Sequence, residues 1–174
     1  MITTKVEHHA VLGACKSLEK KGISVTYLDV DKYGRVDPKA VEANLRDDTC
    51  LVAVMYANNE IGTVEPIAEI AKLLSERKVL FFTDAVQAVG HVPIDVQKLG
   101  VDMLSLSGHK FRAPKGVGAL YIKSGVVIRN LIDGGGQVRS KRGGSVNVGW
   151  IMGLGRAGDV AVEDVRGGGG RLAV

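Results

Sequence analysis

The sequence predicts an α/β domain of three layers, in which helices cover both faces of a mostly parallel β-sheet. Short runs rich in apolar and β-branched residues alternate along the chain with stretches of helical periodicity. Several of these runs are apolar almost throughout, which is typical of parallel strands covered on both faces. With 174 residues, the chain is long enough for one domain with a sizeable core.

Six runs are expected to be strands, and three patterns are expected to be helices. The strands are residues 2–6, 24–30, 51–56, 79–83, 103–107 and 117–122. The helices are marked by Val11, Ala14, Cys15 and Leu18 before Gly22, by Asp37-Pro38 followed by Val41 and Leu45, and by Pro66 followed by Ile67, Ile70, Ala71 and Leu74. A further helix is expected after Trp150. Residues 1–160 then form the core, and residues 161–174 form a frayed glycine-rich tail.

Composition and charge exclude several classes of function. The net charge is +4 and only 5% of residues are aromatic, which argues against nucleic-acid binding. No apolar run approaches the roughly 20 residues that span a bilayer, and the start carries no secretion signal. Two cysteines, Cys15 and Cys50, make neither a disulfide framework nor a metal motif, and both are expected in the core. A cytoplasmic protein without a metal site is expected.

Polar groups follow four of the predicted strands. His8 and His9 follow the first, Asn58-Asn59 the third, Asp84 the fourth, and the stretch "SGHK", residues 107–110, the fifth. Ligands of open α/β sheets gather beyond the carboxyl ends of the strands. Each group also has an ordinary structural interpretation, such as a turn at Asn58, a helix cap at Asp84 or a solvated Lys110. Together, these groups indicate one site.

A lysine at the end of a strand can be solvated, can clamp a phosphate or can act as a nucleophile. Desolvation or a nearby cation keeps part of a nucleophilic lysine neutral, and such an amine condenses with aldehydes. Pyridoxal phosphate is the most common cofactor that uses this chemistry, and it needs a carboxylate beside its pyridine nitrogen. Asp84 is suitably placed for that role. Gln87 and Asn59 are candidate partners of the ring oxygen, and a histidine is a candidate for stacking on the ring.

The chain resembles the NifS-like cysteine desulfurases, which are fold-type I pyridoxal phosphate enzymes. The matching stretches cover roughly residues 2–157 and are "TTKVEHHAVL", "VTYLDVDKYGRVD", "NNEIGTVEPIAEI", "TDAVQAVGHVPIDV", "VDMLSLSGHKFRAPKGVGALYI" and "GGGQVRSKRGGS". The resemblance implies the large domain of a pyridoxal-phosphate-dependent transferase. It also implies an internal fragment, without an N-terminal segment, a catalytic cysteine loop and a C-terminal small domain.

The resemblance further implies a role for each site residue. Two of these residues are implied to be catalytic: Lys110 binds pyridoxal phosphate covalently and later removes the substrate α-proton, and His8 stacks on the ring and helps with proton transfer. The other cofactor contacts come from Asp84 at the pyridine nitrogen, Gln87 at the phenolic oxygen, Asn59 at the cofactor and the substrate carboxylate, Ser107 and His109 at the phosphate, and Ser145 at the phosphate of a partner subunit. The contact from Ser145 implies a homodimer.

The implied reaction converts L-cysteine to L-alanine and leaves the sulfur as a persulfide on an enzyme cysteine. A sulfur-acceptor or scaffold protein then takes the sulfur for iron–sulfur cluster assembly or tRNA thiolation. Since the nucleophilic cysteine loop is missing, we expect this chain to be inactive alone. A selenocysteine lyase, another lyase or an aminotransferase of the same fold remains an alternative. A non-catalytic binding domain, in which residues 134–145 form an anion-binding loop, is a second alternative.

Three residues depart from the pattern of the family. Ala113 replaces a glycine after the lysine, and we expect it to strain a turn that needs a positive φ. Val138 and Val146 replace glutamates in and beside the basic loop. The loss of two carboxylates from a basic loop is expected to leave Arg139 and Arg142 less well paired.

Overall fold

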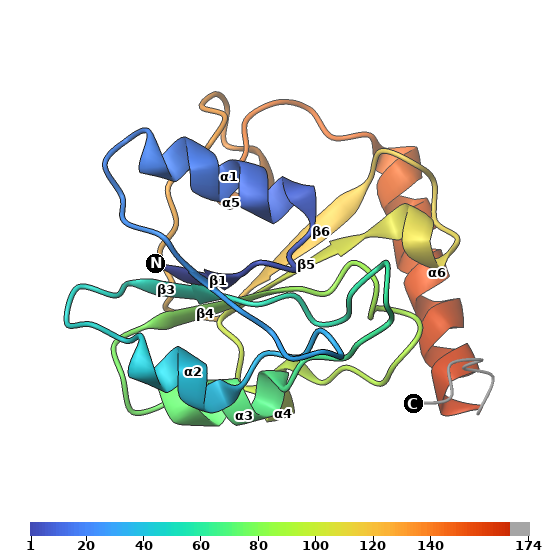
Figure 1. The fold of residues 1–174 in the computed structure, drawn as a ribbon. Helices are drawn as coiled ribbons and strands as arrows, with labels where there is room; N and C mark the ends of the chain where they lie inside the picture. Colours follow the sequence, from blue (N-terminus) through green and yellow to red (C-terminus); the bar gives the residue numbers. More distant parts are fainter. Residues whose placement is uncertain (168–174) are drawn as a thin grey trace.

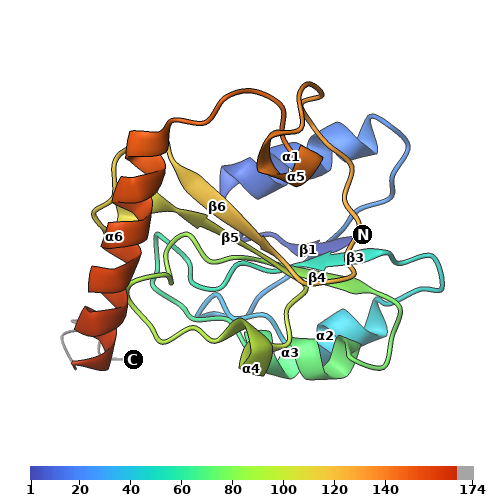
Figure 2. The same ribbon diagram turned by 180° about the vertical axis from the view of Figure 1, so that it is seen from behind.

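The computed structural model describes residues 1–167, which form one six-stranded sheet with helices on both faces (Figures 1 and 2). The strands are β1 (Ile2–Thr4), β2 (Thr26–Leu28), β3 (Leu51–Ala53), β4 (Leu80–Asp84), β5 (Met103–Ser107) and β6 (Gly118–Ile122), in the order β2-β1-β3-β4-β5-β6. All neighbouring pairs are parallel except β5 and β6, which are antiparallel. The predicted three-layer, mostly parallel α/β fold is confirmed.

The helices divide between the two faces of the sheet. Helices α1 (His9–Glu19) and α5 (Gln137–Ser140) lie on one face, and α2 (Pro38–Ala43), α3 (Ile67–Leu74) and α4 (Val96–Leu99) lie on the other (Figure 1). The long helix α6 (Val148–Arg166) stands at the β6 side of the molecule, where it contacts the 3-10 turn η1 (Gly108–Phe111) (Figure 2). No helix within residues 1–167 is long and apolar enough to cross a membrane.

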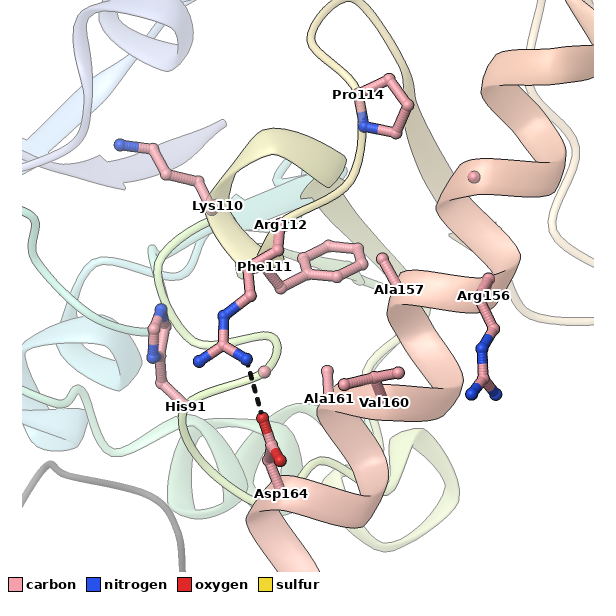
Figure 3. A pocket seen from close by; sticks show the side chains of 12 residues that line it. His91, Lys110, Phe111, Arg112, Pro114, Arg156, Ala157, Val160, Ala161 and Asp164 are labelled. Atoms are coloured by element: carbon pink, nitrogen blue, oxygen red, sulfur yellow. Dashed lines mark hydrogen bonds and ion pairs between the residues drawn. The ribbon is translucent and has the colours of Figure 1, made fainter.

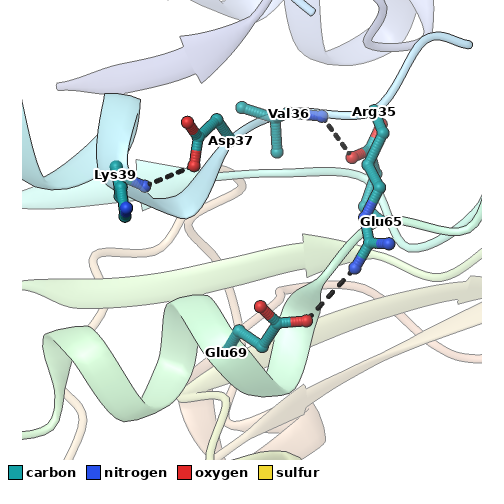
Figure 4. Close-up of polar contacts among 6 residues, drawn as sticks. All are labelled: Arg35, Val36, Asp37, Lys39, Glu65 and Glu69. Atoms are coloured by element: carbon teal, nitrogen blue, oxygen red, sulfur yellow. Dashed lines mark hydrogen bonds and ion pairs between the residues drawn. The ribbon is translucent and has the colours of Figure 1, made fainter. Parts of the chain in front are cut away.

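Helices α1, α2, α4 and α6 begin at a residue whose side chain caps the first turn. Asp37 accepts a hydrogen bond from the backbone N–H of Lys39 at 2.9 Å, and Pro38 occupies the first turn of α2 (Figure 4). On α3, the predicted inner residues Ile67, Ile70, Ala71 and Leu74 are all buried. The short helix α4 was not predicted. It is capped by Asp95, which accepts from Gln97 and Lys98, and ends at Gly100 with a φ of 73°.

The core lies mainly between the sheet and helices α2 and α3. It includes Ile2, Val41, Val52, Ile70 and Phe81, each at most 1% exposed. A smaller cluster joins Cys15 of α1 to the other face through Met1 and Ala53. Cys15 is therefore in the core, as expected.

Three expectations about the chain need correction. Cys50 is exposed rather than buried, because it precedes β3 at the rim of the sheet. Helix α6 continues to Arg166 and buries Ala161, so residues 161–166 are helical rather than frayed. The rest of the expected tail, residues 168–174, lies outside the described residues. The positive φ after the lysine falls on Arg112, at 70°, so Ala113 does not occupy the strained position.

Candidate active site

The carboxyl ends of β1, β3, β4 and β5 meet along one edge of the sheet, which we call the carboxyl edge. These four strands are parallel to one another and adjacent in the sheet. His8 follows β1, Asn58 and Asn59 follow β3, Asp84 ends β4, and Ser107 ends β5. The expectation that these polar groups share one edge is confirmed.

Asp84 is the buried carboxylate of this edge, with 8% of its surface exposed. Its Oδ1 accepts hydrogen bonds from the Val86 backbone N–H at 3.0 Å and from the Ser105 hydroxyl at 3.2 Å. Both bonds go to the same oxygen and orient the carboxylate, which leaves Oδ2 available to a ligand. Asp84 therefore caps a turn and can also pair with a cation at the edge.

Lys110 lies in η1, directly after β5, and is half-buried. The tight turn depends on Gly108, where an added Cβ would lie 2.8 Å from Leu154 Cδ1 and 2.9 Å from Ala113 Cβ. Such distances exclude a side chain unless the neighbours move. The η1 turn is therefore pressed against α6, and the lysine is presented at the carboxyl edge beside β4.

Ser107 and His109 form a hydrogen-bonded pair in the same segment, with 2.9 Å between Ser107 Oγ and His109 Nδ1. Ser107 is half-buried and His109 is exposed. Whichever tautomer the neutral ring adopts, the pair keeps one free donor, either the His109 Nε2–H or the Ser107 hydroxyl, that can bind an anion.

His8 is the N-cap of α1, where its Nδ1 accepts a hydrogen bond from the Ala10 backbone N–H at 3.2 Å. Its ring is exposed. An accepting Nδ1 places the proton of the neutral ring on Nε2, and this fixes the tautomer.

The other predicted site residues are more loosely placed. Gln87 is half-buried in the turn after Asp84, and Asn59 is exposed in the loop after β3. Ser145 lies on the exposed loop between α5 and α6 and not on the carboxyl edge. In α5, Val138, Arg139 and Ser140 all have positive φ, an uncommon conformation for residues other than glycine.

Two residues of this edge, Ser105 and Glu7, were not predicted. Ser105 orients Asp84. Asn58, expected as a turn residue, shapes the loop after β3 by accepting from the N–H groups of Glu60 and Ile61. Glu7 is a buried carboxyl, 5% exposed, and burial raises its pKa from 4.5 to about 7. The interpretation of Asn58 as a turn residue was available from the sequence, whereas the burial of Glu7 was not.

A cavity of about 780 Å³ lies between η1 and α6 (Figure 3). Lys110 contributes to its rim, but its side chain extends away from α6, and Arg112 pairs with Asp164 at 3.1 Å across the cavity (Figure 3). Neither Asp84 nor Ser107 lines this cavity. Within residues 1–167 there is no cluster of three or more side chains that could hold a metal ion.

Comparison of the chain with known proteins identifies its family. Residues 1–158 match the model of the class V aminotransferases. The chain is 55% identical to the cysteine desulfurase IscS of Methanosarcina thermophila, over 95% of this chain and 41% of that protein. It is 56% identical to the cysteine desulfurase IscS of Clostridium botulinum (strain Hall), over 95% of this chain and 42% of that protein.

Solved structures have the same architecture. A NifS-like protein superposes with a TM-score of 0.92 at 46% identity, over 95% of this chain and 46% of that one. SspA in complex with cysteine superposes with a TM-score of 0.89 at 42% identity, over 91% of this chain and 46% of that one. The chain thus spans less than half the length of these relatives.

The cofactor of these relatives is pyridoxal phosphate, and the residues of the carboxyl edge fit it. A buried carboxylate with one oxygen available, a lysine on the next strand exit and a hydroxyl–imidazole pair match its pyridine nitrogen, aldehyde and phosphate. With residues 1–158 matched and these groups at one edge, the chain belongs to the class V aminotransferase family.

Proposed function

We propose that the carboxyl edge binds pyridoxal phosphate and that the whole protein is a cysteine desulfurase, which converts L-cysteine to L-alanine. The observation that carries the proposal is the buried, oriented Asp84 on the strand beside the one that leads into Lys110. Identity of 55% to a cysteine desulfurase supports the choice of reaction.

When bound, pyridoxal phosphate supplies an electron sink for charge that develops on the substrate α-carbon. In this proposal, Asp84 Oδ2 holds a proton on the pyridine nitrogen, while the Ser105 hydroxyl keeps the carboxylate oriented through Oδ1. Lys110 would hold the cofactor covalently, and its Nζ, when free, would accept the substrate α-proton.

The remaining residues orient the ring and the phosphate. His8 stacks on the ring, Gln87 donates to its phenolic oxygen, and Asn59 contacts the cofactor and the substrate carboxylate. Ser107 and His109 bind the phosphate through the pair already joined at 2.9 Å. Ser145, on its exposed loop, reaches the phosphate site of a partner subunit in a homodimer.

Neither cysteine of this chain is suited to accept the sulfur. Cys15 is buried, and burial raises the pKa of its thiol, which disfavours the thiolate that attacks sulfur. Cys50 is exposed but precedes β3, so it lies at the amino edge, opposite Asp84 and Lys110. The accepting thiolate of the whole protein therefore comes from a segment other than this chain.

That thiolate attacks the sulfur of the substrate and forms the S–S bond of a persulfide. The C–S bond breaks, its electrons pass to the three-carbon fragment, and protonation of that fragment gives alanine. A sulfur-acceptor or scaffold protein takes up the sulfur, for iron–sulfur cluster assembly or tRNA thiolation in the cytoplasm. By itself, this chain binds the cofactor and does not turn over.

The test is a titration of the folded chain with pyridoxal phosphate, followed by visible absorption. We expect a yellow band in the wild type and in Lys115→Ala, a nearby exposed lysine, and no band in Lys110→Ala. Cys15→Ala should keep the band. If the folded wild type gives no band, or if Lys110→Ala keeps it, the proposal fails and a non-catalytic anion-binding domain becomes the better interpretation.

A further inference from the structure

Two buried side chains tie the β1–α1 turn, residues 5–8, to the exit of β3. Glu7 Oε1 accepts a hydrogen bond from the Met55 backbone N–H at 2.8 Å, across 48 positions of sequence. Asn58 Nδ2 donates to the Val6 carbonyl oxygen at 2.9 Å, across 52 positions. Glu7 is 5% exposed and Asn58 is 9% exposed. We call these two side chains the turn brace.

The turn brace holds the residue that carries the imidazole of the carboxyl edge. His8 directly follows Glu7, and its only recorded side-chain hydrogen bond within the described residues is the local one to the Ala10 N–H. That bond fixes the ring relative to α1. The position of the ring relative to β3 and β4 depends on the backbone of residues 5–8, and the turn brace fixes this backbone.

Glu7 is anchored through a single oxygen. Oε1 also accepts from the Thr4 hydroxyl at 2.9 Å, whereas Oε2 is buried without a hydrogen-bond partner among residues 1–167. Burial raises the pKa of Glu7 to about 7, and the nearby carboxylates of Asp84 and Glu65 add to this rise, while Glu7 in turn raises the pKa of the Cys15 thiol. The neutral carboxyl is thus the favoured form at mildly acid pH, and its carbonyl oxygen still accepts both bonds.

We propose that Glu7 and Asn58 are positioning residues that set the placement of the His8 imidazole at the cofactor site. This inference rests on the proposed function only in taking His8 to act on a cofactor. The hydrogen bonds of the turn brace form within this chain and do not depend on that function. Because Oε1 acts only as an acceptor, Glu7→Gln should keep both hydrogen bonds, whereas Glu7→Ala should lose them.

Glu65 provides a matched control. It is 3% exposed, its Oε2 accepts from the Val36 backbone N–H at 2.9 Å, and its Oε1 is buried without a partner within the described part of the chain (Figure 4). Glu65→Ala therefore removes a comparable buried brace between two other segments. Both Ala variants should lose similar stability, but only Glu7→Ala acts on the turn that carries His8.

The experiment records the imidazole Cε1–H resonances of the 174-residue chain at pH 6 without cofactor, with the His8 signal assigned by His8→Gln. We expect Glu7→Ala to shift or broaden the His8 signal, and Glu7→Gln and Glu65→Ala to leave it in place. Asn58→Asp, which keeps the Oδ1 acceptor but removes the donor to Val6, should also move the signal and decides the matter if Glu7→Ala does not fold.

In the same variants, pyridoxal phosphate should bind roughly 10-fold more weakly to Glu7→Ala than to Glu65→Ala, in line with the loss of about 1.4 kcal/mol. An unmoved His8 signal in folded Glu7→Ala or Asn58→Asp, or an equal movement in Glu65→Ala, overturns the inference. If the wild type binds no cofactor, the proposed function fails instead. The His8 signals, recorded without cofactor, still test whether the turn brace places the His8 ring.

Discussion

Ser105 donates a hydrogen bond from its hydroxyl to Asp84 Oδ1 at 3.2 Å, across the register pair that joins β5 to β4. The strand that leads into the Lys110 turn thereby orients the buried carboxylate on its neighbour. The two halves of the proposed cofactor site are thus coupled through the sheet, and this coupling can be tested by substitution.

Replacing Asp84 should cost more cofactor affinity than replacing Ser105. Asp84→Ala removes the partner of the pyridine nitrogen, and we expect at least a 100-fold loss, in line with roughly 3 kcal/mol for a charge-assisted bond. Ser105→Ala only frees the carboxylate to rotate, which should cost about 1 kcal/mol, or five- to tenfold.

Asp102 is the control for this comparison. It accepts from the Phe81 backbone N–H at 2.9 Å but precedes β5, at the opposite edge of the sheet. Asp102→Ala should lower the free energy of unfolding and leave the affinity for pyridoxal phosphate within twofold. An equal loss of affinity in Asp102→Ala and Asp84→Ala would show that stability, rather than the site, is being measured.

The pH dependence of stability should carry the signature of Glu7. Its pKa rises from 4.5 to about 7 on folding, so the folded chain binds more protons than the unfolded chain between these values. The stabilisation is complete below pH 4.5 and is lost as the pH rises to about 7, by about 3 kcal/mol. Urea unfolding at a series of pH values measures it.

Glu7→Gln removes this titration. The variant should therefore gain stability relative to the wild type as the pH rises from 4.5 to about 7, with a constant difference above that range. Parallel curves for the two proteins over this range would contradict the burial of an ionisable Glu7.

Gly108 should tolerate no side chain, because the η1 turn is pressed against α6. A Cβ there would lie 2.8 Å from Leu154 and 2.9 Å from Ala113, so Gly108→Ala should lower the free energy of unfolding by about 1–3 kcal/mol. Gly155→Ala, in the middle of α6 with no neighbour within 4 Å, should instead raise it by up to about 1 kcal/mol. Chemical denaturation of both variants distinguishes packing at η1 from a general effect of alanine.

Arg112→Gly should stabilise the turn after the lysine. Arg112 has a φ of 70°, which costs a non-glycine residue about 1 kcal/mol, whereas its ion pair with Asp164 at 3.1 Å is exposed and worth less than that. Asp164→Asn removes the ion pair but keeps the backbone, and it should change the stability by less than 0.5 kcal/mol, on the order of an exposed pair. Destabilisation of Arg112→Gly would mean that the ion pair outweighs the backbone strain.

The elements that the sequence predicted well are those whose signal is local. Ile67, Ile70, Ala71 and Leu74 repeat with the helical period, and all four are buried on α3. Strand bounds were less accurate, because the ladder between β3 and β4 is continued by single bonds, such as the Tyr56 N–H to the Asp84 carbonyl oxygen at 2.8 Å. The sequence pattern extended β3 to residue 56, whereas the strand ends at Ala53.

Features that depend on distant parts of the chain could not be predicted. Glu7 is buried only because Met55 and Asn58 come back to the β1–α1 turn from some 50 positions away. Cys50 is exposed because it precedes its strand at the rim, although its residue type is usually buried. The positive φ fell on Arg112 rather than Ala113, since Arg112 is the residue that ends η1, and helical turns commonly end in a left-handed residue.

The central claim is that Lys110 is the amine that holds pyridoxal phosphate, and covalent trapping tests it most directly. The folded chain is mixed with a slight excess of the cofactor, reduced with borohydride, digested and mapped by mass spectrometry. The account predicts the cofactor mass on Lys110 in the wild type, and none there in Asp84→Ala under the same conditions. Label spread over the exposed lysines, with Lys110 unmodified in a folded sample, would contradict it.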